Sequence, residues 1–445
     1  MAKYEKYDEY KNSGVEWLGE IPNDWEMWKL SHAYTEIGSG TTPSTSNEEN
    51  FEGNIPWVTT GELRENLILD TKKKVSQRTI ERFPTLKKYP IGSVAIAMYG
   101  ATIGRLGIFG IEATTNQACC VMTTSKVLNN KYVFYWLQAF KNEIIQLSSG
   151  GGQPNINQEK VASLKISAPF FEDQINIANF LDHETAKIDT LITKQEKLIE
   201  LLKEKRQAVI SHAVTKGLNP DAAMKDSGVE WLGQVPEHWA VSALGYYTLL
   251  NTGATPDRSN AKYWEGDIPW IKTGEVRYDT IFDTEETISE LAVKQTSVQL
   301  SPVGTLLMAM YGQGITRGRV AILGVPATYN QACVAISPNN QVWNEYLKLF
   351  FMAGYHAIRD GGNETSQMNL NADIVKKFKI LVPPYQEQEE IVHEINQRIP
   401  KIDELLLKAE SAIQLMQERR TVLISAAVTG KINVTNWQNP QAQIL

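Results

Sequence analysis

The stretch SGVEWLG at residues 13–19 decides the architecture, because it returns unchanged at residues 227–233. Other short stretches recur in the same order: IPW at 55–57 and 268–270, MYG at 98–100 and 310–312, NQAC at 116–119 and 330–333, KID at 187–189 and 401–403, and AVT at 213–215 and 427–429. The offset stays between 212 and 214 residues throughout. A repeat of this length has the size of a domain, so the sequence predicts a tandem duplication rather than a short-period solenoid.

Each half of the duplication has a globular part, residues 1–170 and 217–384, the latter including a linker. Both parts are rich in Gly, Pro, Thr and aromatic residues, and their apolar runs at 93–98 and 305–310 are typical of buried strands. Helices are expected near residues 131–146 and 343–358. The sequence therefore predicts a mixed α/β fold in each globular part.

Each half then continues into a helical part, residues 172–216 and 386–431, and the second is followed by a tail at 432–445. Apolar residues recur there every seven positions, which is typical of a long helix that pairs with another helix. The residues on which this pairing depends are Leu181, Ile188, Leu202 and Val209 in the first helix, and Ile395, Ile402, Met416 and Leu423 in the second. Two such helices in one chain most simply pair with each other. The alternative is that each packs on its own domain.

Composition narrows the class of protein. The chain has 445 residues, of which 42% are hydrophobic and 21% are charged, as in a globular protein with several domains. No stretch of 18 apolar residues occurs, and the charged N-terminus lacks the apolar core of a secretory signal, so no membrane association is expected. Three cysteines cannot form a disulfide framework, which favours a reducing cytoplasm. The net charge of −7 argues against coating of nucleic acid by bulk charge, yet it allows a DNA-binding protein with locally basic faces.

The motifs of a catalytic or cofactor-binding protein are missing from the sequence. It has no phosphate-binding loop, and its six histidines lack metal-ligand spacing. The stretch VPPY at 382–385 is similar to an adenine methyltransferase motif, but Val382 cannot accept a hydrogen bond from an amino group. We interpret it as a rigid turn that precedes the second helix. We therefore expect this chain to be non-catalytic, with no cofactor and no metal site of its own.

The ordered set of motifs resembles the specificity subunit of type I restriction-modification enzymes. The matching stretches are SGVEWLG with Pro22 and Trp25, GTTP at 40–43 with IPW, SGGGQPNI at 149–156, PPYQEQ at 383–388, and SAAVTG at 425–430. Together with the duplication, they extend over almost the entire chain.

The resemblance implies a function. Each globular part would be a target recognition domain for one half of a bipartite DNA sequence. The helices would form an antiparallel coiled-coil spacer that sets the gap and docks two methyltransferase subunits. S-adenosylmethionine would bind to those partners, and ATP and Mg²⁺ to restriction (translocase and nuclease) subunits. The assembled complex would then act as a site-specific endonuclease and an adenine-N6 DNA methyltransferase.

Corresponding segments of the two globular parts differ in charge. Residues 71–88 hold seven cations and one acid, whereas residues 284–302 hold one cation and three acids. Two domains with one scaffold and opposite charge are not expected to read identical sequences, so we predict an asymmetric target. The basic run is a candidate for phosphate contacts, although a solvated charged surface is the alternative.

The predicted DNA contacts combine this run with Gly-rich loops and with the turns at MYG. The side-chain amides of the loops can hydrogen-bond to adenine edges, and the arginines after MYG can hydrogen-bond to guanine. Surface ion pairing is an equally good explanation for these arginines. The two tyrosines match between the domains, so they serve backbone contacts or core packing rather than the difference in specificity. In the first domain the predicted residues are Lys72, Lys73, Lys74, Arg78, Arg82, Lys87, Lys88, Tyr99, Arg105, Gly151, Gln153 and Asn155. In the second they are Arg258, Lys272, Arg277, Tyr311, Arg317, Arg319, Asn363 and Gln367.

Two alternatives of other classes stay open at this point. A self-contained adenine methyltransferase would bind S-adenosylmethionine by itself, which the missing motifs disfavour. A duplicated scaffold that binds protein or carbohydrate would have no affinity for DNA.

Overall fold

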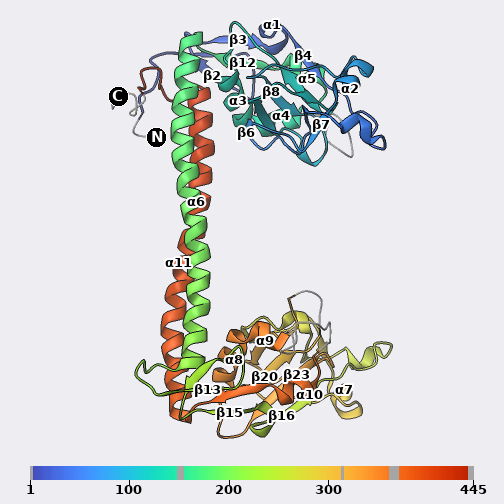
Figure 1. The fold of residues 1–445 in the computed structure, drawn as a ribbon, viewed down its shortest axis with the longest axis vertical. Coiled ribbons are helices and arrows are strands. Elements are labelled where there is room, and N and C mark those ends of the chain that lie inside the picture. The colour runs from blue at the N-terminus through green and yellow to red at the C-terminus, as the bar shows by residue number, and fades with distance from the viewer. Residues whose placement is uncertain (1–3, 148–154, 312–314, 360–369, 439–445) are drawn as a thin grey trace. The chain divides into compact units, whose positions relative to one another are not determined.

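The computed structural model describes residues 4–147, 155–311, 315–359 and 370–438 (Figure 1). The chain forms two compact units. The first combines Met1–Gln195 with Ser411–Leu445, and the second is Glu196–Glu410. Each unit therefore contains one globular domain together with one end of each long helix, rather than one linear half of the chain.

The domain of the first unit is built on a mixed five-stranded sheet. Its order is β4 (Ile37–Ser39), β11 (Cys119–Met122), β8 (Val94–Ala97), β9 (Leu106–Phe109) and β6 (Asn66–Ile68). The edge strand β6 runs parallel to β9, whereas the other pairs are antiparallel. Smaller sheets are β10 (Thr114–Thr115), β5 (Ile55–Val58) and β7 (Lys73–Val75); β1 (Tyr10–Asn12) and β2 (Glu20–Pro22); and β12 (Lys165–Ala168) and β3 (Glu26–Lys29). The short helices are α1 (Leu30–Ala33), α2 (Gln77–Arg82), α3 (Asn130–Ala139), α4 (Lys141–Gln146) and α5 (Gln158–Ser163).

The domain of the second unit repeats this topology. Its five-stranded sheet has the order β16 (Thr248–Thr252), β23 (Cys333–Pro338), β20 (Leu306–Ala309), β21 (Val320–Leu323) and β18 (Thr280–Ile281). The smaller sheets are β19 (Thr287–Ile288), β17 (Ile268–Ile271) and β22 (Thr328–Tyr329); β13 (Met224–Asp226) and β14 (Gln234–Pro236); and β15 (Ala240–Ala243) and β24 (Lys379–Val382). The short helices are α7 (Glu290–Gln295), α8 (Asn344–Ala353), α9 (Tyr355–Arg359) and α10 (Ala372–Lys377).

The central strands are buried on both faces, which explains their uninterrupted apolar sequence. In β8, Val94 and Ile96 belong to the core shared with the helices, whereas Ala95 and Ala97 belong to a second core on the opposite face. Residues of β20 alternate between two cores in the same way. The prediction of duplicated mixed α/β domains is thus confirmed.

The helix expected near residues 131–146 is two helices, α3 and α4, and its partner in the second domain is α8 and α9. The break at Phe140 lets that ring pack on Trp17, with ring centroids 5.0 Å apart. In the second unit Trp231 packs on Phe350 at 5.3 Å. The tryptophan of the repeated SGVEWLG stretch is therefore a packing residue beside this helix pair.

The long helices are α6 (Phe171–Lys216) and α11 (Tyr385–Val428), so each begins one residue before the predicted start, and α11 ends three residues before the predicted end. Within the first unit, Arg420 of α11 pairs with Asp189 of α6 at 2.9 Å. Within the second unit, Arg206 of α6 pairs with Asp403 of α11 at 2.8 Å. The two helices thus contact each other in both units, as the heptads predict. No helix in the described part of the chain is long and apolar enough to cross a membrane.

The eight residues that we predict to pair the helices are all buried or half-buried. Leu181, Ile188, Leu202, Ile395 and Ile402 are buried. The remaining predicted positions, Val209, Met416 and Leu423, are half-buried. In contrast, the companion residues Leu191, Leu198 and Leu405 are exposed. The helix pair therefore buries a narrower row of apolar residues than the heptad pattern contains.

Buried polar side chains anchor the helices to the domains. Gln174 donates to the carbonyl groups of Val127 and Pro169 and accepts from the amide of Asn129, and Gln388 makes the equivalent three bonds in the second unit. Tyr132 donates to the carbonyl of Val428 at the end of α11, and Tyr346 to that of Val214 near the end of α6. The two tyrosine bonds satisfy carbonyl groups that the last turn of each helix leaves unpaired.

Candidate nucleic-acid interface

The basic lobe, residues 71–88, comprises β7, the helix α2 and the turn that follows it. Ser76 caps α2, because its side chain accepts a hydrogen bond from the amide of Thr79. A small core of Trp57, Val75 and Leu86 lies beneath the lobe. This local core fixes the main chain, so the charged side chains point outward from a defined scaffold.

The seven cations of the basic lobe fall into two groups. Lys74, Lys87 and Lys88 pair with Asp70, Glu36 and Glu112 at 2.9, 3.0 and 3.5 Å, respectively. The other group is Lys72, Lys73, Arg78 and Arg82, all exposed. Among the described residues, no carboxylate pairs with any of these four.

The acidic lobe, residues 284–302, has the same elements with the opposite charge. Ser289 caps α7 as Ser76 caps α2. Glu286 pairs with both Arg258 and Lys272, and Glu285 also pairs with Lys272. The ion pair with Arg258, followed by that with Lys272, lowers the pKa of Glu286, and both glutamates raise the pKa of Lys272. Two of the predicted DNA-contacting cations therefore already have carboxylate partners within the domain.

Both domains place a cation over an aromatic ring at corresponding sequence positions, Phe51 and Trp264, but the cation differs. In the first domain, the ammonium group of Lys73 lies 5.0 Å from the ring centroid of Phe51. In the second, Trp264 takes the place of Phe51, and the guanidinium of Arg258 lies 3.7 Å from its ring centroid. Both cations are exposed, so each contact contributes only about 0.5–1 kcal/mol. The sequence positions of Lys73 and Arg258 do not correspond, so this similarity is a result of tertiary structure.

In the first domain, the turn after β8 brings several predicted residues together. Tyr99 and Asn155 form an isolated antiparallel bridge, and the amide of Ile156 donates to the carbonyl of Met98 at 2.8 Å. Burial raises the pKa of Tyr99, whose hydroxyl also contacts the side chain of Gln117. The end of the Gly-rich loop thus lies against the MYG turn, and Arg105 is half-buried in the turn that leads to β9.

In the second domain the predicted residues differ in their exposure and in their contacts. The guanidinium of Arg319 lies 5.6 Å from the ring centroid of Tyr278, and its Nε is buried. Arg277 is exposed and donates to the carbonyl of Gly274 at 2.7 Å. Tyr311 and Arg317 are half-buried. The remaining predicted residues, Gly151, Gln153, Asn363 and Gln367, lie outside the described residues.

One pair of side chains was missed by the sequence reasoning. Gln117 is exposed beside Tyr99, and its carbonyl oxygen accepts from the hydroxyl of Thr42. Gln331 and Thr255 make the same contact in the second domain. The signal was present in the repeated NQAC stretch. Its cysteines Cys119 and Cys333 are buried with a raised pKa, whereas the glutamine two positions before each cysteine is exposed.

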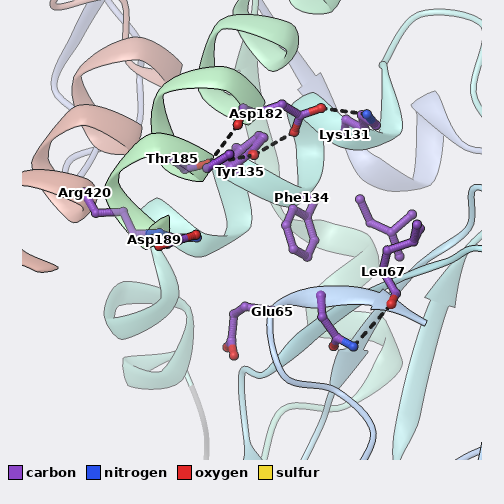
Figure 2. A pocket seen from close by; sticks show the side chains of 12 residues that line it. Glu65, Leu67, Lys131, Phe134, Tyr135, Asp182, Thr185, Asp189 and Arg420 are labelled. Atoms are coloured by element: carbon purple, nitrogen blue, oxygen red, sulfur yellow. Dashed lines mark hydrogen bonds and ion pairs between the residues drawn. The ribbon is translucent and has the colours of Figure 1, made fainter. Parts of the chain in front are cut away.

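A cavity of about 300 Å³ lies in the first unit between the domain and the helices (Figure 2). Asp182 accepts hydrogen bonds from Tyr135 and Lys131, each at 2.7 Å, and the pair of Asp189 and Arg420 lies beside them. Four of the charged groups that line the cavity thus pair with one another, and the fifth, Glu65, pairs with Lys141 at 3.1 Å. We interpret the cavity as part of the contact between the domain of the first unit and the helices, rather than as a ligand site.

Comparisons with known proteins agree with this arrangement of a duplicated domain and long helices. A family model described as "Type I restriction modification DNA specificity domain" matches residues 22–201 and 236–408. The specificity subunit of the type I restriction enzyme MjaIX from Methanocaldococcus jannaschii is 22% identical, with 98% of this chain and 99% of the relative covered. That of EcoKI from Escherichia coli K12 is 21% identical over 74% of this chain and 71% of the relative.

Solved structures share the fold. A chain from a study of complex assembly and conformational transition in a type I R-M system superimposes with a TM-score of 0.73 at 13% identity, covering 93% of this chain and 99% of its own length. The HsdS subunit from Thermoanaerobacter tengcongensis gives a TM-score of 0.58 at 12% identity, covering 93% and 98%. At such low sequence identities, the structural similarity shows a shared fold only.

Two copies of one sheet domain, each hydrogen-bonded to paired long helices, define the class of protein: a duplicated α/β domain with two long helices. The chain belongs to the family of type I restriction-modification DNA specificity subunits, because the family model covers both copies. Specificity subunits recognise DNA and are themselves non-catalytic.

Proposed function

We propose that the chain reads an asymmetric bipartite DNA target, one half with each domain, within a type I restriction-modification complex. The observation that carries this proposal is the difference between the two lobes. The basic lobe has four cations without a carboxylate partner among the described residues, whereas Glu285 and Glu286 neutralise Lys272 and Arg258 beside the acidic lobe. One scaffold with opposite surface charge favours two different half-sites.

The basic lobe, Asn155 and Gln117 are the proposed DNA contacts of the first domain. Lysine and arginine neutralise phosphates without reading sequence, whereas amide side chains pair with adenine edges. In the second domain we retain Arg277, Arg317, Arg319 and Tyr311 as proposed contacts. Arg258 and Lys272 would first have to exchange a carboxylate for a phosphate, which makes them weaker candidates.

The helices are the proposed spacer and the docking site for two methyltransferase subunits. The bonds of Gln174 and Gln388 to the domains support a defined connection between each domain and the start of its helix. Several large apolar side chains face solvent along both helices, as expected for a protein-binding surface. These are Leu191, Leu198, Leu201, Leu405, Leu407 and Leu415.

The catalytic steps belong to the partner subunits in this proposal. Methyltransferase subunits would bind S-adenosylmethionine and methylate adenine N6, and restriction subunits would use ATP and Mg²⁺ for translocation and cleavage. Because the target is genomic DNA, the complex would act in the cytoplasm.

The experiment is to assemble the chain with its methyltransferase subunit, add S-adenosylmethionine and genomic DNA, and map methyladenine by sequencing. We expect one motif of two different short blocks separated by a constant gap. A palindromic motif would refute the asymmetry, and methylation without a motif would refute the recognition role. Methylation by the chain without its partner would refute its non-catalytic role.

A further inference from the structure

Both domains hold one exposed glutamine in the same way, although their charged lobes have diverged. The hydroxyl of Thr42 donates to the side-chain carbonyl oxygen of Gln117, and the hydroxyl of Thr255 donates to that of Gln331. All four side chains are exposed. A hydrogen bond between exposed neutral side chains contributes little to stability, because water offers the same bonds. Its recurrence therefore points to the orientation that it gives the glutamine.

The segment that carries the threonine is packed closely against the small sheet in both domains. A Cβ atom at Gly40 or Gly253 would lie 1.8 or 2.1 Å, respectively, from a main-chain carbonyl oxygen of the neighbouring strand, β10 or β22. The indole of Trp57 or Trp270 donates, at 3.1 or 3.0 Å, to the carbonyl of the residue that precedes the threonine. The threonine hydroxyl is thus held at a defined position.

The glutamine lies in a turn that begins where two parallel strands end. β10 runs parallel to β5, and the amide of Asn116 donates to the carbonyl of Val58 at 3.0 Å. In the second domain β22 runs parallel to β17, and the amide of Asn330 donates to the carbonyl of Ile271 at 3.0 Å. Each asparagine side chain closes its turn by accepting from the amide two residues later, at 3.1 Å. The main chain on both sides of the glutamine is therefore fixed.

The bond to threonine decides which end of the glutamine side chain is available. Its carbonyl oxygen already accepts, so the side chain offers the N–H groups of its amide nitrogen. The nitrogen of Gln331 has no hydrogen-bond partner among the described residues, and Gln117 also contacts the hydroxyl of Tyr99. Bidentate recognition of adenine needs the carbonyl oxygen as an acceptor as well as an N–H donor. This orientation therefore favours a ligand that only accepts hydrogen bonds.

The same tryptophans connect this region to a cation in each domain. Trp57 lies opposite Lys73 in the register of β5 and β7. The guanidinium of Arg258 lies 4.9 Å from the ring centroid of Trp270. Arg258 and Lys272 share two glutamates, so this group of four charges is formally neutral. The surroundings of the tryptophan are thus basic in one domain and neutral in the other, which is compatible with an anionic ligand in both.

We propose that Gln117 and Gln331 donate to the equivalent phosphate of the two DNA half-sites, so that each domain meets its half-site in the same register. A phosphate oxygen only accepts hydrogen bonds and is present in every sequence, which explains why this residue is shared by domains with different targets. Thr42 and Thr255 are positioning residues that hold the side chain in its donating orientation. This inference rests on the proposed function, and it narrows the DNA contact of Gln117 to the backbone.

The test uses the full chain assembled with its methyltransferase subunit. The variants are Gln117→Leu and Gln331→Leu and, for the positioning residues, Thr42→Val and Thr255→Val. The control is Gln386→Leu, which removes an exposed glutamine that also makes one side-chain hydrogen bond. Fluorescence anisotropy gives the affinity for a duplex with the methylated motif and for an unrelated duplex of equal length. Sequencing of methyladenine gives the motif, and thermal unfolding gives the stability of each variant.

We expect each Gln→Leu variant to lower the affinity for both duplexes by about 3- to 10-fold, and each Thr→Val variant to lower it by a smaller factor. The control, the motif and the melting temperatures should stay unchanged. Because a neutral side chain releases no counterion, the slope of log K against log salt should also stay unchanged, in contrast to the cations of the basic lobe.

Wild-type affinity in both glutamine variants would overturn the proposal. A loss confined to the motif duplex, or a changed base in one block of the motif, would overturn it in favour of base reading. A loss that only follows a lowered melting temperature would overturn it in favour of a purely structural bond. If the unchanged complex gave no motif, the proposed function itself would fall, which is distinguishable because that result involves no variant.

Discussion

Replacing Lys72, Arg78 and Arg82 with Gln removes three exposed cations of the basic lobe that have no carboxylate partner among the described residues. If each neutralises one phosphate, the triple variant releases three fewer counterions when DNA binds. The slope of log K against log salt then falls in magnitude by about 0.9 for each contact, or roughly 2.7 in total. Between 50 and 200 mM salt, wild-type affinity should fall by roughly 40-fold more than that of the variant.

A second triple variant serves as the matched control. Replacing Lys74, Lys87 and Lys88 with Gln changes the net charge by the same amount, but these lysines pair with carboxylates at 2.9–3.5 Å. Because a paired lysine must leave its carboxylate to reach a phosphate, we expect a clearly smaller change in slope. The assay is fluorescence anisotropy with duplex DNA over a salt series. Equal slopes for both triple variants would show that only bulk charge matters, and an unchanged slope in the first would remove the lobe from the interface.

Three further outcomes are expected. Gln388→Leu leaves one buried and two partly buried main-chain groups without their side-chain partner, so it should lower the free energy of unfolding by roughly 2–4 kcal/mol in urea titrations. Exposed Gln386→Leu should change it little, and equal losses would contradict the anchoring role. The ion pairs of Glu286 lower its pKa below the ordinary glutamate value. These ion pairs therefore stabilise the fold fully above the ordinary pKa, and this stabilisation is lost as the pH falls through the lowered pKa. The destabilisation by Glu286→Gln should thus shrink between pH 7 and about pH 3 in thermal unfolding, and a constant difference would argue against the ion pairs. A Cβ at Gly253 would lie 2.1 Å from a carbonyl oxygen, so Gly253→Ala should cost about 1–3 kcal/mol in the same urea titrations, whereas the open Gly274→Ala should be nearly neutral; similar values for the two would refute the steric reasoning.

Much of the fold was accessible to sequence reasoning because its signals are local or periodic. The apolar runs at 93–98 and 305–310 predicted the central strands β8 and β20, since strands buried on both faces have no polar alternation. The heptads predicted α6 and α11 to within a few residues at their ends. The proline turn at 383–384 directly precedes α11, as we interpreted it.

The candidate DNA interface was less accessible. The seven cations at 71–88 were visible as a charged run, but their division into paired and unpaired groups depends on Glu36 and Glu112, which lie far away in sequence. The same limit applies to Arg258, because Glu286 is 28 residues further along the chain. The residues that contact DNA stay a prediction in both domains.

The sequence by itself determined the duplication, the family and the two-part organisation of each half, because a repeat and a period can be read without knowing which residues meet. Tertiary structure decided which cations are paired with carboxylates. It also decided that Leu191 and Leu405 face solvent while Ile188 and Ile402 are buried. The physical reason is that pairing of charges and burial of side chains depend on contacts between segments distant in sequence, and no local pattern specifies those contacts.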